Sequence, residues 1–427
     1  MVIGAVIGSA IFLVPSTVLR IHPSPFAALL VVGFAGVLSF FGALAYAELG
    51  SRFTTSGGDY LYLKETWGPL WGFLCGWAFF WVTQTGGIAA LAVGFAQLLG
   101  SLLPVAGVSA KLAAIGLLAL LTWLNFLGVR SGATFGNVMN ILKLSGLAVM
   151  IGAVLQRPQI PNVDWSWPTD WSMAAFAAAL VPVLWAYEGW NMLTFIGEEI
   201  KDPQRNLPKA LAIGLLGVII VYSLSFWIYF KALNVSEIVR SDRVAADAVL
   251  RVLGPVGGTL VTLTMLVALV SSTNACVLTA ARVYFAQARD GLFPPIFARL
   301  HPGHGTPAVA LFGQFLWGAI LCWTGSYEVL FSYCTFGAWI FYTMTVLGVI
   351  VMRRRHPENP SAFQMPGYPW TPLAFATVGA AFVASTLIQT PGPSLIGLLL
   401  ICSGIPAYVY LRRRVSQQST LDSPTQS

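Results

Sequence analysis

Apolar segments long enough to cross a lipid bilayer follow one another along nearly the whole chain, and this pattern excludes most other folds. A transmembrane helix needs about 20 mostly apolar residues. Such segments lie near 1–21, 26–48, 69–99, 110–129, 134–155, 173–199, 208–232, 255–285, 306–323, 327–352, 370–389 and 393–411. Because a bilayer leaves backbone polar groups no water to bond, we expect these segments to be helices. The sequence therefore predicts an all-α, polytopic membrane protein with about twelve transmembrane helices.

Composition and charge agree with a membrane protein. Of the 427 residues 57% are apolar and only 9% are charged, and the mean hydropathy is +0.76, which no soluble globular class shows. The net charge of +7 does not indicate nucleic acid, because the basic residues lie at the ends of apolar spans. With the N-terminus inside, cytoplasmic connections hold about twice as many Lys and Arg as outer ones. We expect a multi-pass protein of the cell membrane with both termini cytoplasmic and a disordered tail at 412–427.

Common motifs of catalytic and metal-binding sites are missing from the sequence. All five cysteines lie within apolar spans and none has the paired spacing of a metal site or a disulfide framework. No HExxH, GxSxG or GKS/T pattern occurs. We therefore expect no enzyme, no metal and no cofactor.

Two spans carry residues that weaken a helix at its centre. The first contains "IGSAIF", with Gly8, Ser9 and Ala10, and the sixth contains "WAYEGWN", with Glu188, Gly189 and Asn191. Interrupted segments at corresponding positions of two halves are typical of inverted-repeat transporters with a site at the bilayer midplane. The alternative is that the small residues only pack one helix against another.

A broken membrane helix has a specific chemical consequence. Its unpaired N–H and C=O groups are tolerated only around a cavity or a ligand. The N–H groups that begin a half-helix attract a carboxylate, and the carbonyls that end the preceding half attract an ammonium group. Two broken helices side by side therefore favour a zwitterion such as an α-amino acid.

Longer stretches carry a family resemblance. They are "AYAELGSRFTTSGGDYLYLKETWGPLWGFLCGW" at 45–77, "WAYEGWNMLTFIGEEIKDPQRNLPKAL" at 185–211 and "ARVYFAQARDGLFPPIFARLHPGHGTP" in the eighth span and after it. With "IGSAIF", they resemble the amino acid–polyamine–organocation superfamily and its L-type amino acid transporter branch. The likeness extends from residue 2 to about 352.

The resemblance implies the leucine-transporter fold and an amino acid substrate. Two inverted five-helix repeats would span 1–155 and 173–352, with two peripheral helices at 370–411. Helices 1, 2, 6 and 7 would rock against the others to give alternating access. The loop 100–110 lacks the cysteine by which animal relatives join a heavy chain. We therefore expect no disulfide-linked partner, and a monomer or weak homo-oligomer.

The resemblance also implies where a substrate binds. Backbone at Gly8, Ser9, Ala10 and Ile11 would hold the carboxylate, and carbonyls near Trp185, Ala186 and Glu188 would hold the amine. Tyr187, Gly189 and Asn191 complete the predicted site. Trp185 falls where the family has an aromatic gate; the alternative is a tryptophan of the core or the lipid face.

Two features depart from the family pattern. Ala10 stands where the family has glycine, and its methyl group takes space beside the substrate. Only seven residues precede Gly8, which gives a first half-helix of roughly 10 Å, too short to seal the cytoplasmic side. We therefore expect the chain to start further upstream.

Two charged residues within spans indicate whether transport is coupled to sodium or to protons. Glu188 could bind an amine or a cation, carry a proton, or form a structural pair. Lys143 lies where sodium sits in sodium-coupled relatives, so the resemblance implies that it replaces sodium, with Ser271 and Ser272 as partners. The alternative is a lysine that snorkels to the interface.

These features together predict transport. We expect sodium-independent exchange, or proton-linked uptake, of neutral L-amino acids. The alternative is a permease or antiporter for cationic amino acids or polyamines, with Glu188 as the counter-charge. Outside transport, an amino-acid sensor on the same scaffold stays open. The sequence does not name the side chain that is carried.

Overall fold

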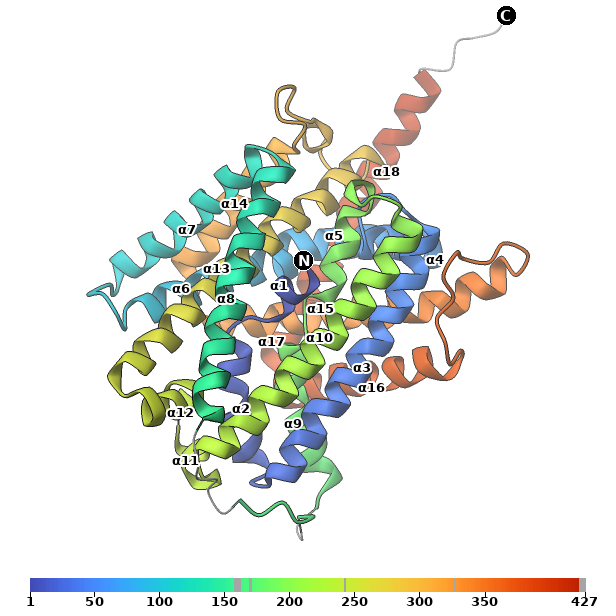
Figure 1. The fold of residues 1–427 in the computed structure, drawn as a ribbon. Helices are drawn as coiled ribbons and strands as arrows, with labels where there is room; N and C mark the ends of the chain where they lie inside the picture. The colour runs from blue at the N-terminus through green and yellow to red at the C-terminus, as the bar shows by residue number, and fades with distance from the viewer. Residues whose placement is uncertain (157–162, 169–170, 242, 326, 422–427) are drawn as a thin grey trace, which may run out of the picture.

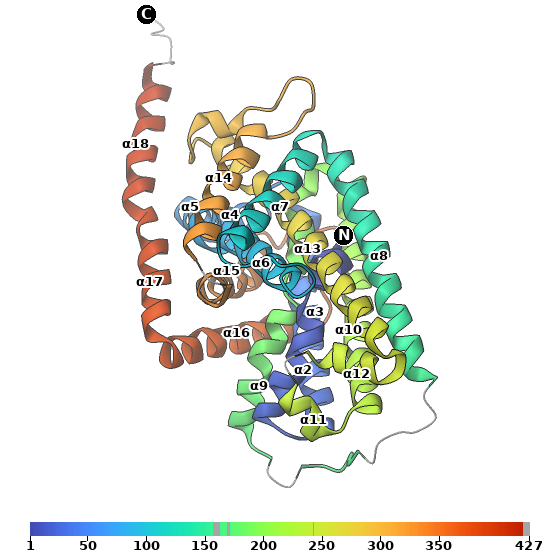
Figure 2. The same ribbon diagram turned by 90° about the vertical axis from the view of Figure 1, so that its left-hand side faces the viewer.

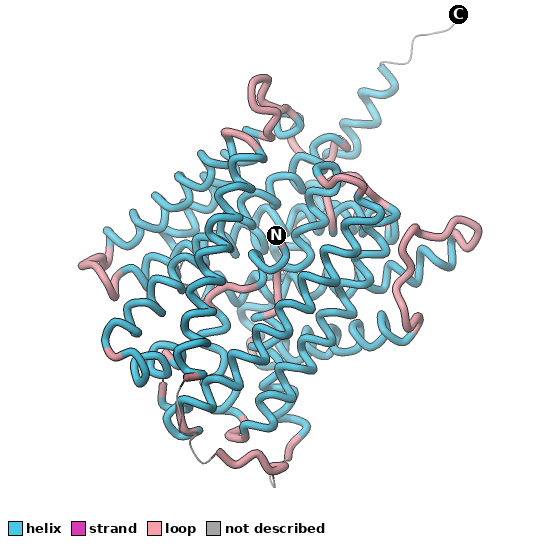
Figure 3. Tube along the Cα trace, viewed as in Figure 1, coloured by secondary structure: helices cyan, strands magenta, loops and turns pink. Residues whose placement is uncertain are grey.

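The computed structural model describes residues 1–156, 163–168, 171–241, 243–325 and 327–421 (Figure 1). These residues form helices joined by loops and turns, and they contain no strand (Figure 3). In the first part of the chain the helices are α1 (Val2–Val6), α2 (Ala10–Ile21), α3 (Pro25–Arg52), α4 (Asp59–Trp67), α5 (Pro69–Ala78), η1 (Phe79–Thr83), α6 (Gln84–Leu99), α7 (Val108–Phe126) and α8 (Val129–Leu155). They continue as α9 (Met173–Ala186), η2 (Trp190–Glu199), α10 (Pro203–Ala232), α11 (Val235–Arg240), α12 (Val244–Leu253), α13 (Pro255–Arg289), η3 (Pro295–Ala298), α14 (Ala308–Thr324), α15 (Tyr327–Arg355), α16 (Trp370–Gln389), α17 (Pro391–Cys402) and α18 (Gly404–Leu421).

The helices match the apolar segments of the sequence. In the described part of the chain, 10 helices are long and apolar enough to cross a membrane, and α2 and α14 are shorter apolar helices. In this count α5, η1 and α6 form one helix, and α9 and η2 form another. The prediction of an all-α polytopic membrane protein is confirmed.

Several helices begin at ordinary sequence signals. The Ser24 hydroxyl accepts the N–H of Ala27 at 3.3 Å at the start of α3, and Ser172 accepts that of Ala175 at 3.3 Å at the start of α9. Asn234 and Glu237 form a reciprocal capping box on α11. Each cap satisfies N–H groups that the helix itself leaves unpaired, so these starts are fixed locally.

Burial separates a centre from a periphery. Within its most apolar stretch α13 is 72% buried, whereas α8 is 22% buried and α7 and α16 are 28% buried each. Large apolar side chains on the outer helices face away from the protein, among them Ile141 on α8 and Leu112 on α7. A helix that is apolar all round but buried on one side only suits a position between protein and lipid. The central position of α13 beside α6 and α8 brings it to the candidate site.

Three spans are not regular α-helices throughout. The first is split between α1 and α2, and the sixth between α9 and the 3-10 helix η2. The third contains the π-helical turn η1, which the sequence does not predict. The two split spans are those in which the sequence predicts interruptions.

The two ends of the bundle differ. The short helices α11 and α12 lie at one end, and α18 projects from the opposite end (Figure 2). Helix α18 continues past the basic residues 412–414 to Leu421. Disorder of the whole tail 412–427 stays a prediction. Its last residues, 422–427, lie outside the described residues.

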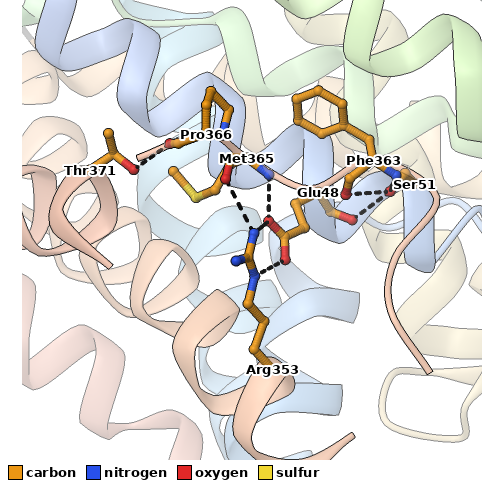
Figure 4. A network of polar contacts seen from close by, with 7 residues as sticks. All are labelled: Glu48, Ser51, Arg353, Phe363, Met365, Pro366 and Thr371. Atoms are coloured by element: carbon orange, nitrogen blue, oxygen red, sulfur yellow. Dashed lines mark hydrogen bonds and ion pairs between the residues drawn. The ribbon is translucent and has the colours of Figure 1, made fainter. Parts of the chain in front are cut away.

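An ion pair ties α3 to α15 and to the segment that follows α15 (Figure 4). Arg353 Nε and Nη2 each donate to the Glu48 carboxylate at 2.7 Å, and the N–H of Met365 donates to the same carboxylate at 2.8 Å. The Glu48 side chain is only 3% exposed. Beside it, Ser51 accepts the N–H of Phe363 at 3.1 Å. One buried carboxylate thus fixes the relative position of two spans and a connection.

Candidate functional site

The breaks in the first and sixth spans lie against each other. Gly189 follows the end of α9 and has a φ of +108°, a conformation that L side chains rarely adopt. A Cβ at Gly189 would meet the carbonyl carbon and oxygen of Ala5 at 3.3 Å. The glycine therefore has two roles: it adopts the backbone conformation of the turn, and its lack of a side chain allows the sixth span to approach α1 closely.

The start of α2 presents free backbone donors to this meeting point. Ser9 is the residue before α2, and its side chain does not cap the helix. The first N–H groups of a helix have no partner within it and carry partial positive charge. Gly8, Ser9 and Ala10 all line the cavity described below. This end of α2 can therefore receive an anionic group.

The carbonyl groups of α1 are bound by two side chains from other spans. Lys143 on α8 is 1% exposed, and its Nζ donates to the carbonyls of Gly4 at 2.8 Å and Ile7 at 2.7 Å. The Ser272 hydroxyl on α13 lies 3.4 Å from the carbonyls of Gly4 and Ala5. Lys143 thus points into the protein, towards α1. Ser271 instead donates to Asn140 Oδ1 at 2.7 Å.

Tyr222 on α10 joins the two breaks, and the sequence analysis missed it. Its hydroxyl lies 2.9 Å from the carbonyl of Val6 and 2.8 Å from that of Ala186. One hydroxyl has one proton, so the two carbonyls share this donor. A tyrosine inside the apolar segment 208–232 is the only sequence signal for this role.

A cavity of about 110 Å³ lies where these elements meet. From the two broken spans it is lined by Ala5, Val6, Gly8, Ser9, Ala10, Trp185, Ala186, Glu188, Gly189 and Met192. From the other spans it is lined by Thr83, Gln84, Gly87, Ala90, Leu91, Ser272, Cys276, Cys334, Thr335 and Ala338. Small side chains dominate both groups, so backbone is close to the space inside.

Most of the predicted substrate residues line this cavity, and three do not. Ile11 is 1% exposed and packs in the apolar core. Tyr187 is fully buried, with its ring 4.9 Å from the ring of Tyr222. Asn191 Nδ2 donates to Asp59 at 2.9 Å and points away from the cavity wall.

Glu188 is the acidic residue of the lining. The hydroxyl of Tyr342 on α15 donates to its Oε1 at 3.0 Å. Its partner is thus neutral, and its carboxyl group remains available to a cationic or hydrogen-bonding ligand.

The wall opposite the breaks was the least predictable part. It comes from η1, α6, α13 and α15, and it includes Cys276 and Cys334. The Cys276 thiol also lies 3.8 Å from the sulfur of Met192. The π-helical turn η1 rotates this part of the third span relative to a regular helix. Its one sequence signal is the set of polar and small residues directly after it, Gln84, Thr85 and Gly86. Of these residues, Gln84 lines the cavity.

A second cavity, of about 190 Å³, is lined in part by Met1 and Gly4 at the start of the chain. It is lined by polar side chains of α8, η2 and α13, among them Asn137, Asn140, Glu199, Ser271 and Asn274. Helix α1 contributes to both cavities, through Ala5 and Val6 to the first and through Gly4 to the second.

Comparison with known proteins agrees with this geometry. The family model described as amino acid permease matches residues 1–405. The chain is 32% identical to the b(0,+)-type amino acid transporter 1 of Mus musculus over 418 residues, which cover 95% of this chain and 85% of that protein.

Two further relatives have similar identity. The serine/threonine exchanger SteT of Bacillus subtilis (strain 168) is 30% identical over 418 residues, 97% of this chain and 95% of SteT. The large neutral amino acids transporter small subunit 2 of Rattus norvegicus is 31% identical over 421 residues, 95% of this chain and 78% of that protein. These relatives are transporters and not enzymes. With its helical membrane fold and its cavity between two broken spans, the chain belongs to the amino acid permease family.

Proposed function

We propose that this protein exchanges small neutral L-amino acids across the cell membrane without sodium. The observation that carries the proposal is the cavity in which the start of α2 meets the end of α9. It offers backbone donors at the start of α2 to a carboxylate, and the backbone carbonyls that end α9 to an amine. The same two groups are common to every α-amino acid, so this site recognises the class of substrate.

The size of the substrate follows from the lining. Gly8, Ser9, Ala10, Ala186 and Gly189 surround the space next to the breaks. Side chains this small leave room for the backbone of an amino acid, while Trp185 and Met192 limit its extent. Trp185 is suited to close the cavity as a gate. The similarity to a serine/threonine exchanger supports small neutral substrates.

The contacts of Lys143 support sodium independence. Its ammonium group donates to two carbonyls of α1 and lies beside the Ser272 hydroxyl, which reaches the same helix. Backbone carbonyls and serine hydroxyls are also ligands that a sodium ion would use, so a fixed ammonium group supplies the same charge without an ion.

The mechanism that we propose is alternating access between two inverted repeats, 1–155 and 173–352, with 370–411 at the periphery. Helix α1 lines both cavities, and its Gly4 carbonyl is bound by Lys143 and Ser272. Movement of α1 relative to α8 and α13 would open one cavity to the other and then to the cytoplasm.

The proposal also covers the orientation of the chain in the membrane and its partner proteins. The excess of basic residues supports two cytoplasmic termini. The connection between α6 and α7, residues 100–107, contains no cysteine, which supports a chain that works without a disulfide-linked partner, as a monomer or weak homo-oligomer. A band of higher mass on a non-reducing gel of native membranes that disappears on reduction would contradict it.

Transport of cationic amino acids or amines is the second candidate, because Glu188 lines the cavity with a neutral partner. Uptake of labelled amino acids into proteoliposomes separates the two candidates. For neutral exchange we expect serine uptake that requires internal amino acid, persists when potassium replaces sodium, and changes less than about threefold in Glu188→Gln, which keeps a hydrogen-bonding group.

The opposite pattern would favour the second candidate. Lysine or a polyamine would then be carried in place of serine, and Glu188→Gln would reduce its uptake at least about tenfold, because a cation would lose its charged partner. Uptake that requires sodium would contradict the proposed role of Lys143.

Thiol modification tests where the substrate binds. Cys276 and Cys334 line the cavity, whereas Cys402 is exposed on α17. We expect N-ethylmaleimide to inhibit exchange and excess serine to protect against it. Cys276→Ala with Cys334→Ala should remove the inhibition, and the control Cys402→Ala should retain it. Inhibition without protection by serine would argue against binding in this cavity.

A further inference from the structure

Asp59 is a fully buried carboxyl group outside the membrane spans, and the proposed mechanism does not use it. It begins the short helix α4, which lies next to α5 and α15 (Figure 1), and it is 0% exposed. Gly58, directly before it, has a φ of +49°, and a Cβ there would collide with Phe195 on η2. This glycine allows the connection to approach the second half of the broken sixth span.

Three membrane spans bind this one carboxyl group. Oδ1 accepts from the Tyr46 hydroxyl on α3 and from the Thr345 hydroxyl on α15 at 3.2 Å. Oδ2 accepts from Asn191 Nδ2 on η2 at 2.9 Å. The side chain therefore holds the second, sixth and tenth spans together.

The groups around Asp59 are polar but not cationic. Each of its three side-chain donors is neutral, so no counter-charge stabilises its ionised form. The other titratable groups that face it are Tyr62 on α4, Cys75 on α5 and Tyr342 on α15. Burial raises the pKa of Asp59 from 3.8 to about 6, against its hydrogen bonds to Tyr46, Asn191 and Thr345, which lower it.

Asp59 is connected to the substrate cavity through two side chains. The Asn191 amide that it binds lies within hydrogen-bonding reach of the Tyr342 hydroxyl. The same hydroxyl donates to Glu188 Oε1 at 3.0 Å, and Glu188 lines the cavity. A change at Asp59 therefore reaches the substrate site through contacts that are all present in the structure.

The network can satisfy both charge states of the carboxyl group. Ionised Asp59 accepts three hydrogen bonds, and bonds to a charged acceptor are about twice as strong as neutral ones. Protonated Asp59 needs an acceptor, and Asn191 Oδ1 is buried without a hydrogen-bond partner. A turn of this amide would offer the oxygen to the new O–H group. The two states thus differ in how firmly η2 is held.

We propose that Asp59 is a positioning residue for exchange whose ionisation, without a counter-charge, loosens the hold of α4 on η2 and so speeds the opening of the site. This inference rests on the proposed exchange function. When Asp59 is protonated, the neutral group is compatible with its buried position, η2 stays against α3 and α15, and the site opens slowly. When it is ionised, the cost of a buried charge outweighs the three hydrogen bonds, and η2 moves more readily because opening hydrates the carboxylate.

The test is serine exchange in proteoliposomes at equal pH inside and outside, from pH 5 to 8. We expect the rate to rise about tenfold as the pH rises through about 6, which corresponds to relief of about one pKa unit of the burial effect when the site opens. Asp59→Asn, a neutral isostere, should keep the slow rate at every pH. Tyr46→Phe removes a donor to the ionised form and should move the midpoint upward.

Matched variants separate this role from others. Asp164→Asn changes an exposed aspartate and should leave the profile unchanged. Glu188→Gln should retain the step at about pH 6; loss of the step in Glu188→Gln and not in Asp59→Asn would overturn the proposal. A pH-independent wild type that exchanges serine would also overturn it.

A second readout does not depend on transport. Because the pKa of Asp59 is raised in the folded state, its contribution to stability is present below about pH 4 and is lost as the pH rises through about 6. We expect the wild type, but not Asp59→Asn, to lose thermal stability in detergent across that range. Absence of exchange at any pH would refute the proposed function alone, and equal pH dependence of stability in both proteins would refute the role of Asp59.

Discussion

Replacing Lys143 by methionine is expected to reduce amino acid exchange about 100-fold. The lysine donates to the Gly4 and Ile7 carbonyls from a site that is 1% exposed. Methionine has a similar length and no donor, so two buried carbonyls lose a partner at about 1–3 kcal/mol each, and each 1.4 kcal/mol is tenfold in a population or rate. Helix α1 has five residues, which is too short to be stable alone. Its position, and with it the cavity wall at Ala5 and Val6, depends on these bonds.

The matched control is Lys111→Met. Lys111 also donates to a backbone carbonyl, that of Trp323 at 2.7 Å, but at an exposed position far from the breaks. We expect this variant to exchange within about twofold of the wild type, because an exposed donor is replaced by water. Exchange is measured per reconstituted protein, after a gel-filtration profile shows that both variants are folded. Lys143→Met with more than half of wild-type exchange would contradict this account of α1.

The helical spans and the two breaks could be predicted from sequence because both leave local signals. Hydropathy marks α3, α10 and α13 directly, since a membrane span must be apolar along about 20 residues. The breaks were visible because Gly8 and Gly189 stand beside polar residues in stretches where neither is expected. Even the neighbourhood of Lys143 could be inferred, since a buried lysine in a span needs carbonyl or hydroxyl partners.

The direction of side chains around a break could not be predicted. Asn191 is two residues after Gly189, yet its amide binds Asp59 and not the cavity. Its direction depends on the φ of +108° at Gly189 and on the 3-10 geometry of η2, neither of which the sequence states. Tyr222 was missed for a related reason. Its hydroxyl matters because α10 packs beside both breaks, and that is a property of the tertiary structure.

The ion pair of Glu48 gives the largest expected change in stability. Glu48→Gln keeps the shape of the side chain and an acceptor for the N–H of Met365, but it leaves Arg353 without a counter-charge (Figure 4). Removing one partner of a fully buried pair costs about 3–5 kcal/mol, and because the Arg353 side chain is 24% exposed and can be hydrated, we expect about 2–3 kcal/mol here. The loss should appear as a lower unfolding temperature in detergent, because α3, α15 and the connection through Phe363 and Met365 lose a common attachment.

The same substitution at an exposed pair provides the control. Glu198 accepts from Arg289 at 3.1 and 3.3 Å, with side chains 38% and 49% exposed. Glu198→Gln should cost less than about 1 kcal/mol, because water and salt screen such a pair. High salt should weaken the Glu198 pair and leave the Glu48 pair almost unchanged, since burial limits screening. If the two variants unfolded at the same temperature, Glu48 would not be the attachment between α3 and α15, and the surrounding apolar contacts would have to account for it.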